Sequence, residues 1–283
     1  MKLKTTQWIA IAASIVLVVV IYLFADNTKP LVRAEAPMAA RDKGAQKSDE
    51  GAGPAFDWEG YMKKVTSGIT SPDSLKLVQG WESGHTEADM RSLVQFYHGR
   101  GESVAEAYYT EELGQMKHSS EVLVRAGDLY AATAGISNED DMHQYLLAKS
   151  VESYKAATDL DSSAPTRLKL ASAYMDQGTA PMQGVSILLD VVNKDPNNAD
   201  AQFLLGKFGI VSRQFDKAIV RLEKVVSLRP QNYDAVFLLA VAYSGKGDNQ
   251  KAAALLDKCA AMVDKPELKQ KIKEYKESLG KGQ

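Results

Sequence analysis

The sequence predicts an all-α protein in which antiparallel helix pairs stack on one another. A spacing of small and apolar residues recurs three times between residues 164 and 266. Pro196 and Pro230 close successive copies about 34 residues apart, which is a known period of helix-pair repeats. A single helix pair cannot bury its own apolar face, so copies stack and bury a continuous core. Such a stack usually offers a surface to another polypeptide instead of a catalytic pocket.

The clearest copy covers residues 199–232. Its second helix starts after a short turn, and Gly206 and Ala218 fall on the two helices of the pair. We expect the helices to cross at these two residues, because a larger side chain would push them apart. The pattern residues of this copy are Leu205, Gly206, Ala218, Leu222 and Val225.

Two neighbouring copies keep the same frame. Residues 233–265 retain Leu239, Ala240 and Tyr243 at the corresponding positions. Residues 164–198 need one extra residue in the turn, and Pro181 is expected to begin the second helix there, since proline is tolerated in the first helical turn.

Toward the amino terminus the frame weakens. Asn138 is expected to start an elongated second helix that runs through Leu160. Residues 93–113 are predicted to form a degenerate copy, and residues 56–69 a leading helix. At the other end, residues 266–279 are polar except for one apolar stripe, as a capping helix requires; the stripe is Leu268, Ile272, Tyr275 and Leu279.

Residues 121–266 resemble tetratricopeptide repeats. The resemblance implies an α-solenoid with a concave groove that is lined mainly by the first helix of each pair. The predicted organisation is a transmembrane signal anchor at residues 1–25, a flexible linker at 26–55, a degenerate helical region at 56–118, tetratricopeptide repeats at 119–266 and a capping helix at 267–283.

An uncharged apolar run occupies residues 8–24. As a helix it would span roughly 26 Å, just enough for the hydrocarbon core of a bilayer once interfacial residues are added. Trp8 and Tyr22 fall near its edges, where amphipathic rings prefer to lie. A cleaved signal peptide is the alternative, but the run is longer than the usual apolar core of such peptides. We therefore favour an uncleaved signal anchor.

The charges around this run suggest an orientation. Lys2 and Lys4 precede it directly, which favours an amino terminus in the cytosol and repeats outside it, in the periplasm if the source is a Gram-negative bacterium. Residues 26–55 are rich in Ala, Pro, Gly and charges, so they are expected to form a flexible tether.

No constellation of residues indicates catalysis, a metal or a cofactor. The four histidines, His85, His98, His118 and His143, have no ligand spacing. Cys259 is the single cysteine, so an internal disulfide is excluded, and we expect a buried core thiol. The net charge of -2 gives no basic footprint for nucleic acid. The protein is therefore not expected to be an enzyme.

The resemblance also indicates candidate ligand contacts on the first helices. Chaperone-binding members of the family clamp a terminal carboxylate with Lys, Asn and Arg, but Lys207 is the only basic residue at these positions here. About half of the positions, Phe203 and Phe237 above all, are expected to pack between repeats instead. The candidates are Leu168, Ser172, Met175, Asp176, Asp200, Phe203, Lys207, Ile210, Asp234, Phe237 and Val241.

Two functions follow as expectations. The first is a membrane-anchored adaptor or chaperone-like module that binds a polypeptide in the groove, similar to single-span envelope proteins of this family that help secretion, outer-membrane assembly or cytochrome maturation. The alternative is a structural subunit of a larger envelope assembly, or a scaffold that self-associates into homo-oligomers. A binding module should be monomeric and capture peptides, whereas a subunit should co-purify with fixed partners.

Overall fold

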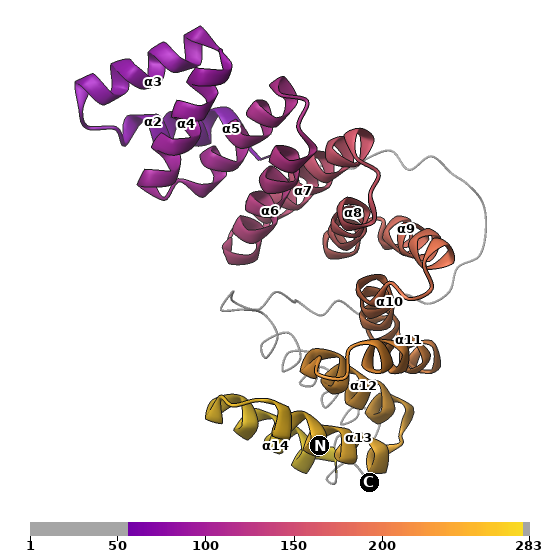
Figure 1. The fold of residues 1–283 in the computed structure, drawn as a ribbon. Helices are drawn as coiled ribbons and strands as arrows, with labels where there is room; N and C mark the ends of the chain where they lie inside the picture. The colour runs from indigo at the N-terminus through magenta and orange to yellow at the C-terminus, as the bar shows by residue number, and fades with distance from the viewer. Residues whose placement is uncertain (1–55, 280–283) are drawn as a thin grey trace, which may run out of the picture. The chain divides into compact units, whose positions relative to one another are not determined.

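The computed structural model describes residues 56–279, and every regular element in this range is an α-helix (Figure 1). The predicted all-α helical repeat is therefore confirmed. The predicted anchor at residues 8–24 and the linker at 26–55 lie outside the described residues. Among the helices of the described part, none is long and apolar enough to cross a membrane.

The described residues divide into two compact units at the boundary between Pro181 and Met182. Below, the first unit means residues 56–181 and the second unit residues 182–279. The division falls inside the predicted repeat region at 119–266, at the turn where the sequence pattern needs one extra residue.

The first unit contains seven of the described helices, and neighbours along the chain pack on one another from α3 to α8. The predicted leading helix and elongated second helix are confirmed as α2 and α7. Helices α4 and α5 lie where the degenerate copy is expected, and its assignment as a repeat stays a prediction. The sequence analysis predicts no helix at α3. The helices are α2 (Trp58–Ser67), α3 (Pro72–Gly84), α4 (Glu87–Arg100), α5 (Ser103–Met116), α6 (Ser120–Ile136), α7 (Asp140–Leu160) and α8 (Ala164–Gln177).

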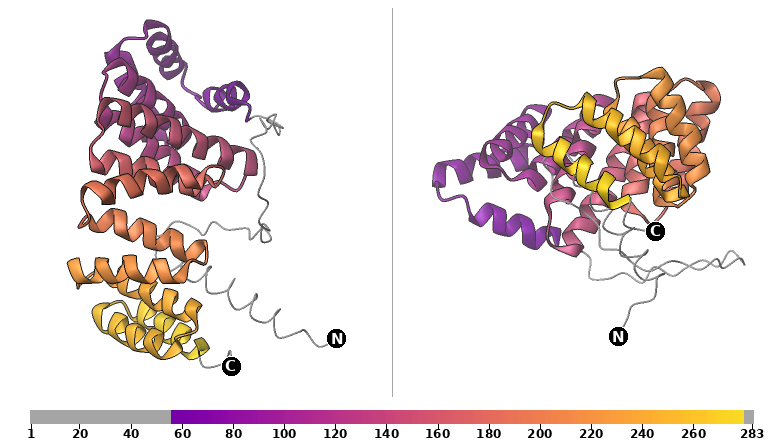
Figure 2. Two further views of the ribbon diagram at one scale, coloured as in Figure 1. Left: turned by 90° about the vertical axis from the view of Figure 1, so that its right-hand side faces the viewer. Right: turned by 90° about the horizontal axis from the view of Figure 1, so that it is seen from below.

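In the second unit, α10 to α14 pack in chain order as successive layers (Figure 2). As predicted, a helix begins at Pro181, and a polar helix ends the unit. The helices are α9 (Pro181–Lys194), α10 (Ala199–Val211), α11 (Phe215–Leu228), α12 (Tyr233–Lys246), α13 (Asn249–Met262) and α14 (Pro266–Leu279).

Side-chain caps fix where the repeat helices begin. The Asn198 side-chain oxygen accepts a hydrogen bond from the Ala201 backbone N–H at 3.0 Å, at the start of α10. Asn232 does the same for the Ala235 N–H at 3.0 Å, at the start of α12. At the end of α12, Gly247 adopts a φ of 92°, a left-handed conformation that glycine adopts without steric cost. The repeat boundaries are therefore set by local chemistry at both ends.

Small residues let α10 and α11 approach closely, but the pairing differs from the prediction. A Cβ on Gly206 would lie 2.7 Å from Leu222 Cγ, and a Cβ on Gly209 would lie 3.0 Å from the Cβ of Ala218. The sequence analysis places Ala218 opposite Gly206, which is wrong. Because the helices are antiparallel, one turn forward on α10 corresponds to one turn back on α11, so both pairs belong to one crossing.

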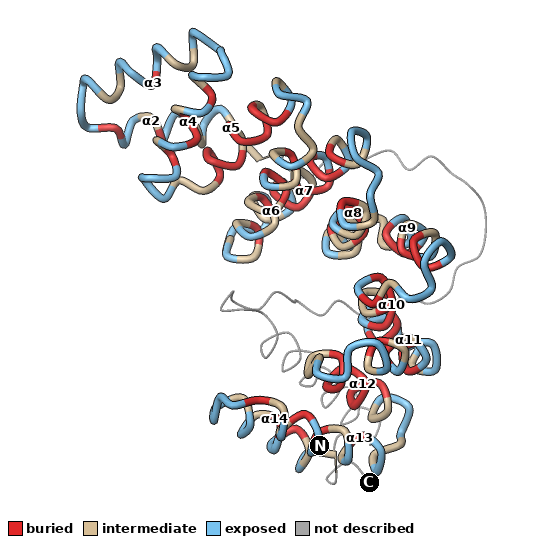
Figure 3. The backbone as a smooth tube through the Cα atoms, viewed as in Figure 1, coloured by how far each residue is buried: buried red, intermediate tan, exposed pale blue. Residues whose placement is uncertain are grey.

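A close contact also joins the two repeats of the second unit. A Cβ on Gly245, near the end of α12, would lie 2.3 Å from Phe215 Cε1, near the start of α11. The Phe215 ring therefore contacts α12 directly, and it packs against the buried hydrophobic cluster formed by α10 to α14, called the core cluster below. Buried residues of this cluster lie on the sides of the helices that face one another (Figure 3).

A polar network is buried in the first unit. Glu111 of α5 is 4% exposed and accepts hydrogen bonds from the Tyr130 hydroxyl of α6 at 2.9 Å and the Ser153 hydroxyl of α7 at 3.1 Å. The Lys149 ammonium lies 3.4 Å from the same carboxylate. Burial and the adjacent carboxylate raise the pKa of Tyr130 above its usual range. Glu111 therefore ties three helices together from inside.

Aromatic rings attach the start of the described chain to α5 and α7. The ring of Trp58 lies 4.6 Å from that of Tyr108, and the ring of Phe56 lies 4.7 Å from that of Tyr145. Tyr61 of α2 packs in the same cluster, and burial raises its pKa to about 12. Residues near the predicted linker are thus anchored to the repeats by side chains.

Candidate functional site

The candidate groove residues fall into both units. Leu168, Ser172 and Met175 on α8 are half-buried, and Asp176 is exposed. The Ser172 hydroxyl donates a hydrogen bond to the Asp176 carboxylate at 3.3 Å. The remaining candidates lie on α10 and α12 in the second unit, and we describe those separately.

Three of the candidates form a stripe on α10. Asp200, Phe203 and Lys207 are spaced by three and four residues, so they lie on one side of the helix. Asp200 and Lys207 are exposed, and Phe203 is half-buried against the core cluster. Below, these three residues are called the α10 stripe.

The charges of the α10 stripe differ in their surroundings. Asp200 accepts two hydrogen bonds from the Arg229 guanidinium, at 2.5 and 2.9 Å, and this pairing raises the pKa of Arg229. Lys207 has no hydrogen-bond or ion-pair partner for its ammonium among residues 56–279. The stripe therefore presents one paired carboxylate, one partly covered ring and one unpaired cation.

Three other candidates lie in the core, which corrects the prediction for Ile210 and Val241, whereas Phe237 is expected to pack between repeats. Ile210, Phe237 and Val241 are 8%, 0% and 4% exposed, so all three are buried. Every residue from 235 to 242 is buried, because α12 packs against α10, α11 and α13, and the Phe237 ring lies 5.7 Å from that of Tyr275 on α14. Asp234 remains half-buried at the start of α12.

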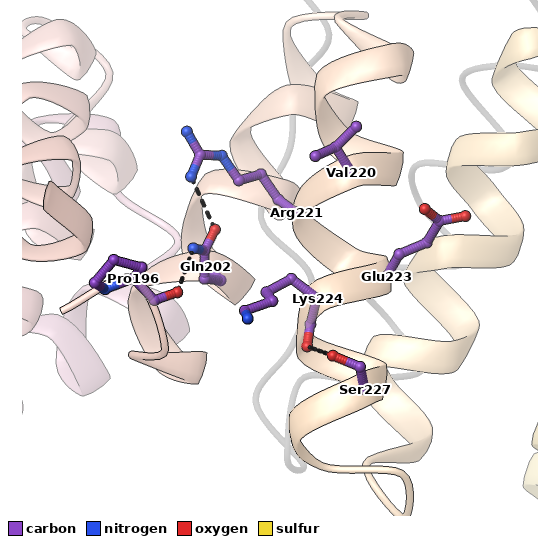
Figure 4. Close-up of a pocket in the computed structure, with 7 residues that line it drawn as sticks. All are labelled: Pro196, Gln202, Val220, Arg221, Glu223, Lys224 and Ser227. Carbon is purple, nitrogen blue, oxygen red and sulfur yellow. Dashed lines mark hydrogen bonds between the residues drawn. The ribbon is translucent and has the colours of Figure 1, made fainter.

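A cavity lies on the outer face of α11, away from the predicted contacts. It has a volume of about 490 Å³. Figure 4 shows Arg221 and Lys224 extending from α11 on the side of Pro196, with the Gln202 side chain between them, while Glu223 projects the other way. It is lined by Pro196, Gln202, Val220, Arg221, Glu223, Lys224 and Ser227. We call it the α11 cavity.

A second, smaller cavity lies in the first unit. Its volume is about 220 Å³, and its walls come from α3, α4 and α5 and the turn after α3. The Tyr109 hydroxyl donates a hydrogen bond to Glu82 at 2.7 Å, and burial together with this carboxylate raises the pKa of Tyr109 above its usual range. The lining residues are Glu82, His85, Met90, Tyr108, Tyr109 and Glu112. Neither cavity is predicted by the sequence pattern, because each is lined by residues from more than one helix.

The described residues contain no group of three or more His, Cys, Asp or Glu side chains that could hold a metal ion. Cys259 is fully buried, and burial raises the pKa of its thiol to about 12. The thiol is therefore protonated and shielded at neutral pH, as expected of a core cysteine. The arrangement is suited to binding by surface contacts.

By its fold, this is a helical-repeat protein. Residues 210–271 match the family model described as the tetratricopeptide repeat. The matched range runs from the end of α10 into α14. No catalytic family is indicated by the matches described here.

The peroxisomal targeting signal receptor of Saccharomyces cerevisiae is similar to part of this chain. The two are 26% identical over 117 residues, which is 41% of this chain and 19% of the receptor. The chain thus spans about a fifth of the length of the curated relative that it matches.

Solved structures of helical-repeat proteins are also similar. A crystal structure of MamA protein has 23% identity and a TM-score of 0.47, and covers 63% of this chain and 92% of MamA. MamA from Desulfovibrio magneticus RS-1, from residue 41 to its end, has 20% identity and a TM-score of 0.49, at 62% and 94% coverage. YrrB, described as a TPR protein with an unusual peptide-binding site, has 15% identity and a TM-score of 0.47, at 68% and 94% coverage. At these scores the likeness carries no argument about what this chain binds.

Proposed function

We propose that this protein is a membrane-tethered module that binds a polypeptide partner through exposed residues on the first helices of its repeats. The observation that carries the proposal is the α10 stripe, which adjoins the matched repeat region. It offers an apolar ring between an acidic and a basic group on one side of a helix. Such a mixed surface suits a peptide with both apolar and charged side chains.

The name of the yeast relative supports the same class of function, since a targeting signal receptor recognises a polypeptide. The similarity covers 117 residues, so it supports polypeptide binding and no particular signal. The tether and the location rest on the sequence. The apolar run at residues 8–24 would anchor the protein, and the linker at 26–55 would hold the repeats away from the bilayer. The repeats would lie outside the cytosol, in the periplasm if the source is a Gram-negative bacterium.

Membrane attachment can be tested directly. We expect the mature protein to begin at or near Met1 and to stay with membranes during alkaline extraction, because the apolar run exceeds the core of a cleaved signal peptide. The measurements are amino-terminal sequencing by mass spectrometry and extraction at high pH. A mature terminus between residues 25 and 40, with soluble protein, would remove the anchor from the proposal.

Polypeptide binding through the α10 stripe can be tested with Lys207→Ala. The side chain is exposed and unpaired among the described residues, so the free energy of unfolding should change by no more than about 0.5 kcal/mol. Partner capture, measured by photo-crosslinking in membranes and mass spectrometry, should nevertheless fall.

Lys258→Ala on α13 is the matched control for this test, because Lys258 is also an exposed helical lysine. It should leave capture unchanged. Equal losses from both variants, or no loss from Lys207→Ala, would contradict binding through the α10 stripe and favour repeats packed in a larger assembly.

A further inference from the structure

The α11 cavity is a second candidate for recognition, and it does not depend on the α10 stripe. We infer that it binds an acidic side chain of a polypeptide segment, with an apolar neighbour of that side chain packed on Val220. Three features of the cavity support this inference. They are its two cationic side chains, a carboxylate that is hydrogen-bonded outside the cavity, and an exposed apolar side chain.

Arg221 is held in position before any ligand arrives. Its guanidinium donates a hydrogen bond to the Gln202 side-chain oxygen at 2.9 Å. The Gln202 side-chain nitrogen in turn donates to the Pro196 carbonyl at 2.9 Å, and Gln202 is 5% exposed. This chain of two hydrogen bonds restricts the rotamers of Arg221 while most of its N–H donors stay available. A fixed guanidinium loses less entropy when it binds a carboxylate.

Lys224 adds a second cation on the same side of α11 (Figure 4). Within the described part of the chain, its ammonium has no ion-pair partner. The Arg221 guanidinium and the Lys224 ammonium therefore both attract an anion.

Glu223 is the only carboxylate in the wall of the α11 cavity, and it is engaged elsewhere. It accepts a hydrogen bond from the Tyr243 hydroxyl of α12 at 2.6 Å, and this bond raises the pKa of Tyr243 to about 12. In Figure 4 its side chain points away from Arg221 and Lys224. The side of the cavity that faces Pro196 is thus positive.

The apolar part of the wall favours a polypeptide over other anions. Val220 is 66% exposed on the α11 side of the cavity, and Pro196 is exposed on the opposite side (Figure 4). An acidic residue next to an apolar one would satisfy both features. Anionic membranes are instead recognised by clusters of roughly four to eight basic residues, and the cavity holds two.

The test uses the full-length chain in detergent micelles and two synthetic peptides. One alternates glutamate and leucine, and the other has glutamine in place of every glutamate. We expect the acidic peptide to bind more tightly, and Arg221→Gln and Lys224→Gln each to weaken it by roughly fivefold, as expected when one partly exposed charge interaction is lost. Arg221→Lys should recover only part of the loss, because lysine lacks the planar fork.

Lys217→Gln is the matched control, since it removes an exposed lysine from α11 outside the cavity wall. It should leave binding unchanged, and thermal melts should show all variants folded. The inference is overturned if both peptides bind equally, or if Lys217→Gln weakens binding as much as the cavity variants. It is also overturned if the cavity variants lose binding only to vesicles with anionic lipid, which would assign the surface to a membrane.

Discussion

Gly206→Leu is expected to destabilise the second unit by about 3 kcal/mol, the upper part of the range for overpacked cores. Even the Cβ of the new side chain would lie 2.7 Å from Leu222 Cγ, and Leu222 is 0% exposed, so it has no space to move into. Relief requires α10 and α11 to separate. Urea or thermal unfolding followed by circular dichroism measures the loss.

Gly99→Leu is the control for this prediction. Gly99 lies in α4, and a Cβ built on it meets nothing within 4 Å, so the same substitution adds bulk without a clash. Hydrogen exchange should locate the damage of Gly206→Leu in α10 to α13 and leave α4 to α7 protected, since repeat stability depends on near neighbours. Equal melting of the two variants would mean that the crossing is not close.

Glu111→Ala should cost about 3 kcal/mol of stability in the first unit, the lower end for breaking a buried charge pair. The change removes the acceptor for the Tyr130 and Ser153 hydroxyls and the carboxylate beside Lys149. The two hydroxyls then lack a hydrogen-bond acceptor and the ammonium lacks an adjacent carboxylate, in a buried region where water cannot easily replace Glu111. The measurement is denaturant unfolding followed by tryptophan fluorescence, because Trp58 and Trp81 both lie in this unit.

The neighbouring glutamate offers the matched control. Glu112 lies on the same helix, is half-buried, and has no hydrogen-bond partner among the described residues, so Glu112→Ala should cost much less. Glu111→Gln keeps an oxygen acceptor and should fall between the two. If Glu111→Ala and Glu112→Ala were equally mild, the buried network would not stabilise the unit.

The helical repeat can be predicted from the sequence because its signals are local. Pro181 and the acidic residues after Asn138 mark helix starts by their own chemistry, and the structure begins α9 and α7 at Pro181 and Asp140. α3 also has local start signals, with Ser71 as N-cap and Pro72 in the first turn, but it belongs to no copy of the repeat, so the repeat frame does not predict it. Helix existence therefore follows from residues within a few positions of one another.

The surfaces are harder to predict, because they depend on residues far apart in the chain. The frame places Val241 toward a groove, but α12 is enclosed by its neighbours and buries this side chain. Glu111 and Glu112 look alike in sequence, and only partners 19 and 42 positions away decide that Glu111 is the buried one. The α11 cavity likewise needs Gln202 to reach across from α10.

The close contact between the Phe215 ring and Gly245 limits how repeats of this chain can be duplicated. One repeat earlier, the position of Gly245 is occupied by Val211, and one repeat later the position of Phe215 is occupied by Asn249. The contact between phenylalanine and glycine therefore occurs at this one junction between repeats, and the two repeats could not form it if their order in the chain were exchanged. The repeats are therefore not interchangeable. A copied or transplanted unit of about 34 residues would pack here only if it carried both a glycine at the position of Gly245 and a phenylalanine at the position of Phe215.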